Sequence, residues 1–408
     1  MTPSLQERRT TPMTQIIEPQ KPRLEVADIF RKHIKEYQNT YPLYPAQQRV
    51  VSHLLNCRTA QLGGHLDRCS HCGAQRILYH SCRNRHCPKC QQIPRERWLE
   101  ARKSEVLPVT YFHCVFTLPH ELNPLILKNK SLMFNMLFQS VSHTLITFGK
   151  KELGGKIGFI SVLHTWDQRL KAHFHLHCLV AGGALCSKTK RWIPCKDNYL
   201  FNQEALSLVF RGKFIEHLTR AVRQEKIEVG RKYHRFKKKL YKHKWVVSVR
   251  DPIKRPQHVL EYLARYTHRV AIANSRLLHL KDGSVTFRVK DRKHNKIRKV
   301  SISAVKFIHR FFLHILPHGF CRIRHYGFLA NRDRKTHLNL IRRLLKWTFP
   351  LPRITHSLKE MMLKLTGINI TLCPCCKIGE MKRVIEIPPG IGKHPFSFIR
   401  PPNYQPSG

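Results

Sequence analysis

The stretch that decides the fold of this chain is His173-Phe174-His175-Leu176-His177-Cys178-Leu179-Val180. Side chains alternate between the two faces of a β-strand, so the three histidines share one face. The opposite face carries Phe174, Leu176, Cys178 and Val180, and it is apolar enough to pack on a core. Three imidazoles on one face are poor core material but good metal ligands. The stretch therefore predicts a strand that is buried on one side and binds a metal ion on the other.

Segments around this strand predict a sheet flanked by helices. The polar turn Asp167–Lys171 is short enough to join the strand to the one before it in an antiparallel hairpin, and Gly182-Gly183 is expected to end the second strand. The remaining expectations are strands over 111–118, 158–166 and 172–181, a basic hairpin over 284–301, and helices over 26–37, 47–55, 132–148, 203–224 and 303–316. This order predicts an α+β fold, with a central sheet domain between about residues 105 and 290.

The net charge indicates the partner. The chain has 74 Lys and Arg against 25 Asp and Glu, a formal net charge of +49, and a sequence pI near 10.4. Such an excess would repel itself, so it implies a polyanionic partner, and its spread along the chain suits a long nucleic-acid path. A membrane surface is the weaker alternative, because no basic helix with a clean apolar face stands out.

Length and cysteine usage bound the class of protein. A chain of 408 residues is expected to form two to four domains. No apolar stretch reaches roughly 18 residues, so no membrane span is expected, and residues 1–22 read as a polar, disordered tail. The 14 cysteines are therefore expected in a reducing cytoplasm, where closely spaced pairs indicate metal more often than disulfides.

Two Cys-x2-Cys pairs predict a structural zinc site. Cys69 and Cys72 are separated from Cys87 and Cys90 by 14 residues, and four thiolates with this spacing can surround one tetrahedral zinc ion. Four thiolates leave no open coordination position, so this site would fold the chain rather than catalyse. Basic residues beside the ligands are expected to contact DNA phosphates, namely Arg83, Arg85 and Lys89.

Further cysteines and histidines allow additional zinc sites. A second site could use Cys57, His65, Cys82 and His86, although these could also be ordinary loop residues. Near the far end, Cys373 and Cys376 supply half of a third site. The other half is not visible in the sequence unless His394 or Cys321 returns to it.

Two tyrosines supply a candidate nucleophile. Tyr262 and Tyr266 lie within a helix expected over 256–273, and residues four apart share a helix face. A tyrosine can attack phosphorus and form a covalent ester, and nearby cations such as Arg265 and Arg269 help the phenol to ionise. A metal held by imidazoles can keep positions open and polarise a phosphodiester. The alternative is a helix that packs two aromatic rings against the sheet.

These motifs occur in an order that resembles a known family. A histidine strand followed by Tyr-x3-Tyr resembles the HUH-type single-strand endonucleases. The block Arg85-His86-Cys87-Pro88-Lys89-Cys90-Gln91 is similar to the zinc domain of insertion-sequence-91 family transposases. Later blocks of that family are similar to Phe116–Leu122, His164-Thr165-Trp166, Tyr262–Arg269 and Ile323–Gly327. The resemblance covers about residues 45 to 380.

The resemblance implies a fold, a reaction and roles for residues. It implies an RRM- or ferredoxin-like nuclease sheet and rolling-circle transposition in the bacterial cytoplasm at the nucleoid. A tyrosine would cleave single-stranded DNA, leaving a 5′-phosphotyrosine and a free 3′-OH, with Tyr266 the stronger candidate on family grounds. His175 and His177 match the motif histidines and would bind Mg²⁺ or Mn²⁺. The third ligand could be His173, on the same face, or a residue elsewhere such as His113 or His164.

The expected domains follow from these motifs. They are a tail and leading helix over 1–44, a zinc-binding DNA-contact domain over 45–105, a tyrosine nuclease domain over 106–290, and a basic, partly helical region over 291–408. Two other functions remain open. A zinc-dependent DNA-binding regulator would leave the histidine strand unused. A metal-dependent hydrolase that uses water would need further Asp and His ligands, and Asp is scarce here.

Overall fold

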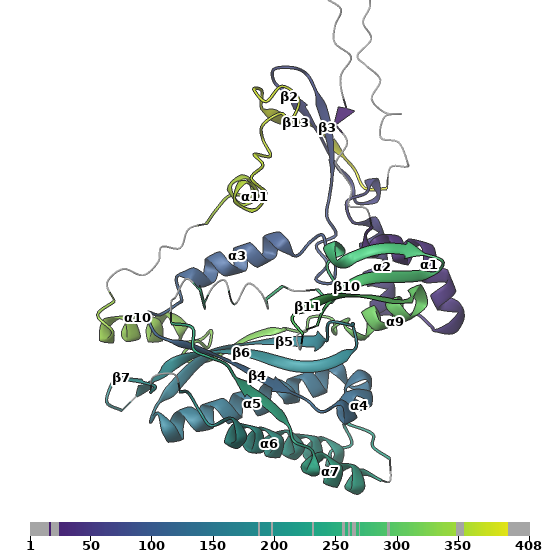
Figure 1. Cartoon of the computed structure of the whole chain (residues 1–408). Helices are drawn as coiled ribbons and strands as arrows, with labels where there is room; N and C mark the ends of the chain where they lie inside the picture. The colour runs from purple at the N-terminus through teal and green to yellow at the C-terminus, as the bar shows by residue number, and fades with distance from the viewer. Residues whose placement is uncertain are drawn as a thin grey trace, which may run out of the picture. The chain divides into compact units, whose positions relative to one another are not determined.

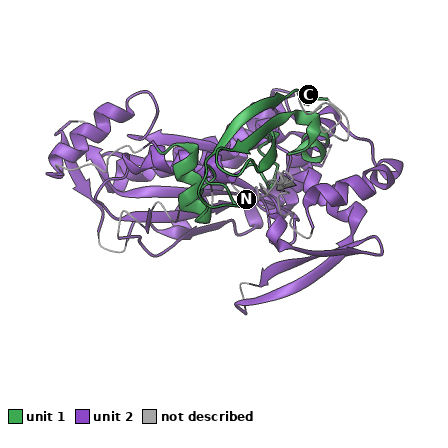
Figure 2. Ribbon diagram, turned by 90° about the horizontal axis from the view of Figure 1, so that it is seen from above, with its two compact units in different colours: residues 1–23, 52–90, 356–408 green, residues 24–51, 91–355 purple. Residues whose placement is uncertain are grey.

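The computed structural model describes residues 16–17, 24–186, 188–196, 199–230, 232–254, 258–259, 262, 267–268, 270–291, 294–347 and 355–390. The chain divides into two compact units, coloured green and purple in Figure 2. Unit 1 combines residues 1–23, 52–90 and 356–408, and unit 2 combines 24–51 and 91–355. The sequence predicts four consecutive domains, but the units are not consecutive. The C-terminal segment 356–408 belongs to the same unit as the cysteine-rich segment 52–90.

Unit 2 is built around an antiparallel sheet. Its six strands are β4 (Tyr111–Thr117), β5 (Lys156–Trp166), β6 (Ala172–Cys186), β7 (Arg191–Pro194), β8 (Val246–Val249) and β12 (Ile323–Gly327). They run in the order β12-β5-β6-β4-β8, and β7 pairs with β6. The predicted hairpin is confirmed, because β5 and β6 pair antiparallel across the turn 167–171. The carboxylate of Asp167 fixes that turn by accepting from the backbone N–H groups of Arg169 and Lys171.

Helices cover the sheet on both faces. On one face of the sheet lie α5 (Lys130–Glu152) and α6 (Gln203–Arg223) (Figure 1). They pack on the apolar side chains of the strands, among them Phe116, Phe174 and Leu176. The other face carries Ile160 and Leu179, which pack with apolar residues of α3 (Gln92–Lys103) and α10 (Arg334–Leu344). This mixed α+β architecture with an antiparallel sheet flanked by helices is the fold class that the sequence predicts.

A second, smaller layer in unit 2 joins distant segments. The strands β9 (Leu277–Lys281), β10 (Ser284–Asp291) and β11 (Lys296–Ser303) form a three-stranded sheet that contains the predicted basic hairpin. The helix α9 (Ala304–Leu313) follows it and packs on α1 (Val26–Thr40). The ring of Phe30 lies 5.3 Å from that of Phe311, so burial of aromatic rings fixes α1 on α9.

Unit 1 is a four-stranded sheet in the order β1-β3-β2-β13. The hairpin of β2 (Gly64–Cys69) and β3 (Gln75–Tyr79) lies in its middle, β1 (Ile16–Ile17) borders β3, and β13 (Met381–Ile387) pairs antiparallel with β2. The remaining elements of the two units are α2 (Pro45–Asn56), α4 (Asn123–Lys128), α7 (Tyr233–Lys242), α11 (Leu358–Thr366) and the short 3₁₀ turns η1 (Ala60–Leu62), η2 (His120–Leu122) and η3 (Asn274–Arg276).

Two local expectations differ from the structure. The strand β6 continues through Gly182-Gly183 to Cys186, because β7 pairs with it there and the indole of Trp192 occupies the place where a side chain at Gly183 would lie. The helix expected over 256–273 ends earlier: His258, Val259 and Tyr262 are helical, but Thr267 and His268 form a turn. The left-handed backbone of His268, with φ of 51°, is a conformation that ends helices. Among the described residues, no helix is long and apolar enough to span a membrane.

Candidate active site and cysteine clusters

Three histidines of unit 2 converge on one face of the large sheet. The pairing of β5 with β6 sets His164 opposite His175, and His177 is two residues further along β6 on the same face. All three are nearly buried, at 4%, 8% and 9% exposure, and their ring nitrogens lie within 4.8 Å of one another. The pairing of β5 with β6 therefore gathers three imidazoles at one point.

His164, rather than His173, completes this group. The ring of His173 lies near the start of β6, 4.7 Å from the ring of His175 and 5.8 Å from that of His120. Its backbone carbonyl accepts a hydrogen bond of 2.9 Å from Nδ1 of His175. The structure thus replaces His173 by His164 in the candidate ligand set. The reason is the register between two strands, which a single-strand pattern does not contain.

The hydrogen bonds of these rings orient them for a cation. Nδ1 of His175 donates to a carbonyl, which leaves its Nε2 without a hydrogen. That Nε2 lies 3.1 Å from Nε2 of His177, whose Nδ1 is 2.8 Å from Nε2 of His113. If two ligand atoms each lie about 2.1 Å from one ion and their bonds to it form a right angle, the two atoms are about 3 Å apart. The spacing of the two Nε2 atoms and the burial of the three imidazoles therefore fit a divalent metal ion.

A tyrosine is connected to this cluster through His113. The hydroxyl of Tyr262 is hydrogen-bonded to Nδ1 of His113, and the two rings meet edge to face with centroids 4.8 Å apart. His113 is buried on β4, and burial, followed by the positive charge of Arg250, lowers its pKa to about 3. It is therefore neutral at pH 7. Tyr266, Arg265 and Arg269 lie outside the described residues.

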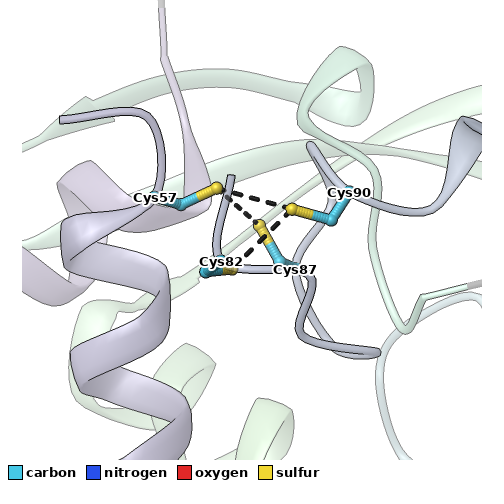
Figure 3. A group of neighbouring side chains, drawn as sticks. All are labelled: Cys57, Cys82, Cys87 and Cys90. Atoms are coloured by element: carbon cyan, nitrogen blue, oxygen red, sulfur yellow. Dashed lines mark hydrogen bonds between the residues drawn. The ribbon is translucent and has the colours of Figure 1, made fainter. Parts of the chain in front are cut away.

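The first cysteine cluster consists of Cys57, Cys82, Cys87 and Cys90 in unit 1 (Figure 3). In the sequence, its members precede β2 or follow β3, at the open end of that hairpin. The Sγ atom of Cys57 is 3.5 Å from that of Cys90 and 3.6 Å from that of Cys87, and Cys82 is 3.7 Å from Cys90. Four sulfurs about 2.3 Å from one tetrahedral zinc ion lie about 3.8 Å apart. The neighbouring sulfurs raise the pKa of the Cys87 thiol. A cation at the centre would remove that penalty, so the cluster fits zinc.

The four cysteines predicted to share one zinc ion fall into two different clusters. Cys69 and Cys72 do not join Cys87 and Cys90, because the hairpin lies between the two pairs. Cys69 ends β2 at the hairpin tip, whereas Cys82 follows β3 at the open end. A strand of six residues at about 3.4 Å per residue separates the two ends by roughly 20 Å. Cys69 and Cys72 lie instead with Cys373 and Cys376 in a second cluster of four.

The second site expected from Cys57, His65, Cys82 and His86 is not formed as a group. Cys57 and Cys82 belong to the four-cysteine cluster, but the two histidines do not. His65 lies on β2, where its Nε2 is 3.6 Å from a carboxylate oxygen of Asp67. The backbone N–H of His86 donates to the side chain of Asn84, which shapes the turn before Cys87. His394 lies outside the described residues, and Cys321 is exposed elsewhere, in unit 2.

Basic side chains surround the first cysteine cluster. Arg83 is exposed and has a left-handed backbone, with φ of 52°, which turns the chain between Cys82 and Cys87. Arg85 and Lys89 are half-buried, and the carbonyl of Lys89 accepts a hydrogen bond from the guanidinium of Arg58. The three predicted DNA contacts therefore lie on the loops that present the cysteines.

Comparison with known proteins identifies the class of molecule. Residues 29–118 match the family described as transposase zinc-binding domain, and residues 158–336 match the family described as putative transposase. The chain is 43% identical to the putative transposase y4qJ of Sinorhizobium fredii, over 90% of this chain and 96% of that protein. It is 27% identical to the transposase for insertion sequence element IS801 of Pseudomonas savastanoi pv. phaseolicola, over 80% of this chain and 81% of that protein. No solved structure matches.

The chain is therefore a transposase, an enzyme that acts on DNA, with an N-terminal zinc-binding domain. It belongs to the insertion-sequence-91 family of transposases. The matched regions cover the histidine cluster and the first cysteine cluster, but not residues 337–408, which contain Cys373 and Cys376.

Proposed function

We propose that this transposase cleaves single-stranded DNA with a tyrosine at the histidine cluster and forms a 5′-phosphotyrosine intermediate. One observation carries the proposal: the hydroxyl of Tyr262 is joined through His113 to His177, so a potential nucleophile and potential metal ligands share one hydrogen-bonded chain. Packing alone would account for an aromatic ring at this position. It would not require His113 and His177 to link the phenol of Tyr262 to His175 by hydrogen bonds.

The direction of these hydrogen bonds favours an ionised tyrosine. With a metal ion bound to Nε2 of His175 and of His177, Nδ1 of His177 would carry the ring hydrogen and donate to Nε2 of His113, 2.8 Å away. Neutral His113 then keeps its own hydrogen on Nδ1 and donates it to the oxygen of Tyr262. A donor at this oxygen stabilises the phenolate, which is the nucleophilic form. His113 is therefore proposed as a positioning residue for the tyrosine.

The proposed reaction balances without a further reactant. The phenol releases its proton to solvent, and its oxygen attacks phosphorus. The bond from phosphorus to the 3′-oxygen breaks, and that oxygen takes a proton to become a free 3′-OH. The strand stays attached to the enzyme through its 5′ phosphate. The 3′-OH can prime copying, and the attached strand can later be passed to a second DNA site.

His164, His175 and His177 are the proposed ligands of the catalytic metal, taken to be Mg²⁺ or Mn²⁺. When bound, the ion would polarise the phosphodiester and stabilise the negative charge that develops as it breaks. The residues themselves hold the Nε2 atoms together and keep His177 in the tautomer that serves His113. Arg265 and Arg269 are proposed to supply positive charge near the tyrosines.

Tyr262 and Tyr266 together would allow two covalent linkages in alternation, as in rolling-circle transposition. The family resemblance favours Tyr266 as the first nucleophile, whereas the contact with His113 favours Tyr262. We propose that both act, and that Cys57, Cys82, Cys87 and Cys90 bind a structural zinc ion. Arg83, Arg85 and Lys89 would then contact DNA phosphates beside that zinc.

A denaturation-resistant adduct tests the proposal. The protein is incubated with 3′-end-labelled single-stranded DNA from the ends of its element and Mg²⁺ or Mn²⁺, then separated under denaturing conditions, because the fragment on the 3′ side of the cut is the one that stays attached. A labelled band at the protein's size that phosphodiesterase removes is expected. No cleavage would favour a DNA-binding regulator, and cleavage without an adduct would favour a hydrolase that uses water. Either result overturns the tyrosine mechanism.

Single substitutions then divide the work between the tyrosines. Tyr262→Phe and Tyr266→Phe should each reduce either adduct formation or the later strand transfer, and the double variant should form no adduct. Tyr199→Phe is the matched control, because Tyr199 is exposed and lies between β7 and α6, away from the cluster. If the double variant still forms the adduct, the nucleophile is another residue.

A further inference from the structure

We infer that Cys69, Cys72, Cys373 and Cys376 form a second zinc site, which is built from both ends of the chain. Cys69 Sγ lies 3.7 Å from Cys376 Sγ, and Cys72 Sγ lies 3.7 Å from Cys373 Sγ. All four sulfurs lie within 4.8 Å of one another, close to the spacing of about 3.8 Å around one tetrahedral zinc ion. Cys72, at the hairpin tip, is thus 301 residues away from Cys373 in the sequence.

The backbone around these sulfurs is arranged for thiolates. The N–H groups of His71 and Cys72 point at Cys69 Sγ, at 3.4 and 3.5 Å. In the same way the N–H of Gly379 points at Cys376 Sγ, at 3.3 Å. Both Cys-x2-Cys turns therefore donate N–H groups to their first or last sulfur, and such donors stabilise the charged form that binds a metal.

Gly379 makes room for the cluster. A side chain at this position would overlap Cys69 Sγ and the backbone of His71, so only glycine lets the C-terminal turn approach the hairpin tip. Its carbonyl also accepts from the N–H of Cys373. The two turns therefore fit each other closely enough for their sulfurs to share one ion.

The strand β13 extends the contact between the two chain segments. It pairs antiparallel with β2, from Met381 opposite Cys69 to Ile387 opposite Gly64. The N–H of Ser70 donates to the carbonyl of Glu380, and the N–H of Glu380 donates to the hydroxyl of Ser70. This reciprocal pair holds the two cysteine turns in register.

The apolar core at this end is too small to hold the segments alone. Among the described residues it consists of Cys69, Ala74, Cys373 and Met381, with Cys376 packed against it. Three of these five residues are the proposed ligands. Domains with so little apolar burial need a metal or disulfides to fold. None of the 14 cysteines is in a disulfide, and separations of 3.7 Å exceed the length of a disulfide bond, about 2.05 Å.

The consequence is that the zinc-binding unit is not complete until the C-terminal segment has been made. Residues 91–355, which belong to unit 2, are inserted between the segments 52–90 and 356–408 of unit 1. A chain that ends before residue 356 would keep Cys57, Cys82, Cys87 and Cys90 but lose half of the second site. The inference is independent of the cleavage chemistry, because it concerns a closed four-thiolate site.

Zinc content tests the inference directly. The full chain is purified in zinc, and its metal content is measured by mass spectrometry in a His175→Ala, His177→Ala background, so that the histidine cluster does not contribute. Two zinc ions per chain are expected, one for each four-cysteine cluster. Cys373→Ser and Cys57→Ser should each remove one. Cys375→Ser is the matched control, because Cys375 is exposed and outside the group of four, and it should keep both.

A second measurement covers variants that fail to fold. The native full chain is treated with an alkylating agent before and after a zinc chelator, and the labelled cysteines are located by peptide mass spectrometry. Cys69, Cys72, Cys373 and Cys376 should be protected together and become reactive together, while Cys375 reacts in both samples. One zinc ion per chain, unchanged zinc in Cys373→Ser, or a Cys72–Cys373 disulfide in the native chain would overturn the inference.

Discussion

The hydroxyl of Tyr262 is hydrogen-bonded to Nδ1 of His113, across 149 residues of sequence. His113 in turn contacts His177 with its other ring nitrogen, at 2.8 Å. One buried imidazole therefore connects β4, β6 and the segment that carries the tyrosine pair. A partner that orients a metal ligand typically contributes 10–100-fold to activity or metal affinity. The contact thus has measurable consequences.

Replacing His113 with alanine should reduce adduct formation about 10–100-fold, because both the tyrosine and His177 lose their partner. Two conservative variants separate the two contacts. Asn reproduces the Nδ1 position and should keep the contact with Tyr262, whereas Gln reproduces the Nε2 position and should keep that with His177. The rate of adduct formation is measured against Mn²⁺ concentration. His113→Gln should retain near-normal Mn²⁺ dependence but have a low maximal rate. His113→Asn should retain a near-normal maximal rate but need more Mn²⁺ to reach it.

The control for this series is His318→Ala, which removes an exposed histidine of unit 2 and should change neither quantity. If all three His113 variants lose activity equally and need the same Mn²⁺ concentration, His113 serves only packing. Circular dichroism of each variant confirms that the fold is retained.

The stability of unit 2 should fall as the pH is lowered from about 6.5 toward 4. His314 is buried, donates from Nε2 to the carbonyl of Leu170 at 3.0 Å and lies 3.3 Å from the hydroxyl of Thr165. Burial lowers its pKa to about 4 from an ordinary value of 6.5. Between these values the unfolded chain binds a proton that the folded chain does not. The contribution of neutral His314 to the free energy of unfolding is therefore complete above pH 6.5. It is lost as the pH falls toward 4, at up to ~1.4 kcal/mol per pH unit.

Urea midpoints at several pH values measure this effect. His314→Gln removes the titrating group, can still donate to a carbonyl, and should flatten the slope between pH 6.5 and 4. His325, whose pKa is also lowered to about 4 by burial and by Arg102, remains in that variant and keeps part of the slope. An unchanged slope in His314→Gln would show that this residue does not titrate on unfolding.

Much of the sheet could be predicted because its pattern is local. Histidines alternate with apolar residues over β6, and the turn 167–171 lies within reach of both strands, so periodicity and turn chemistry suffice. The same local view misread Gly182-Gly183 as a strand end. Those glycines lie in the strand because Trp192 of β7 packs where a side chain would be, and that neighbour is a property of the folded sheet.

At the candidate sites the sequence left the third histidine open and grouped the cysteines wrongly, and both have one physical cause, which is pairing between distant segments. The choice of His164 over His173 depends on the register of β5 against β6. The division of the cysteines depends on the β2–β3 hairpin and on β13, which returns more than 300 residues later to pair with β2. Spacing within one segment indicates that a Cys-x2-Cys turn binds metal, but it does not indicate which second turn completes the site.

Two glycines with similar backbone conformations should respond differently to alanine. Gly327 on β12 has φ of 65° and Gly283, between β9 and β10, has φ of 67°. A side chain at Gly327 would overlap the carbonyl of Ile157, which accepts a hydrogen bond from Phe328, whereas nothing lies within 4 Å at Gly283. Gly283→Ala should cost ~1–2 kcal/mol, the strain of the left-handed conformation alone. Gly327→Ala should cost more than ~3 kcal/mol.

The two variants are compared by the free energy of unfolding in urea. Gly327→Ala should also loosen β12 from β5, which hydrogen exchange at Phe159 and Ser161 would detect. Equal costs for both variants would mean that the edge strand moves away freely and does not anchor the sheet.

The dependence of DNA binding on salt should reveal which cations contact phosphates. With a net charge of +49, the affinity for single-stranded DNA should fall steeply as salt increases, because each neutralised phosphate releases about 0.7 counterions. Arg83→Ala should lower the slope of log affinity against log salt by about 0.7 and weaken binding to all sequences alike. Lys188→Ala, an exposed change in the turn between β6 and β7, should leave the slope unchanged. Equal slopes for Arg83→Ala and the unmodified chain would remove the loop between Cys82 and Cys87 from the DNA path.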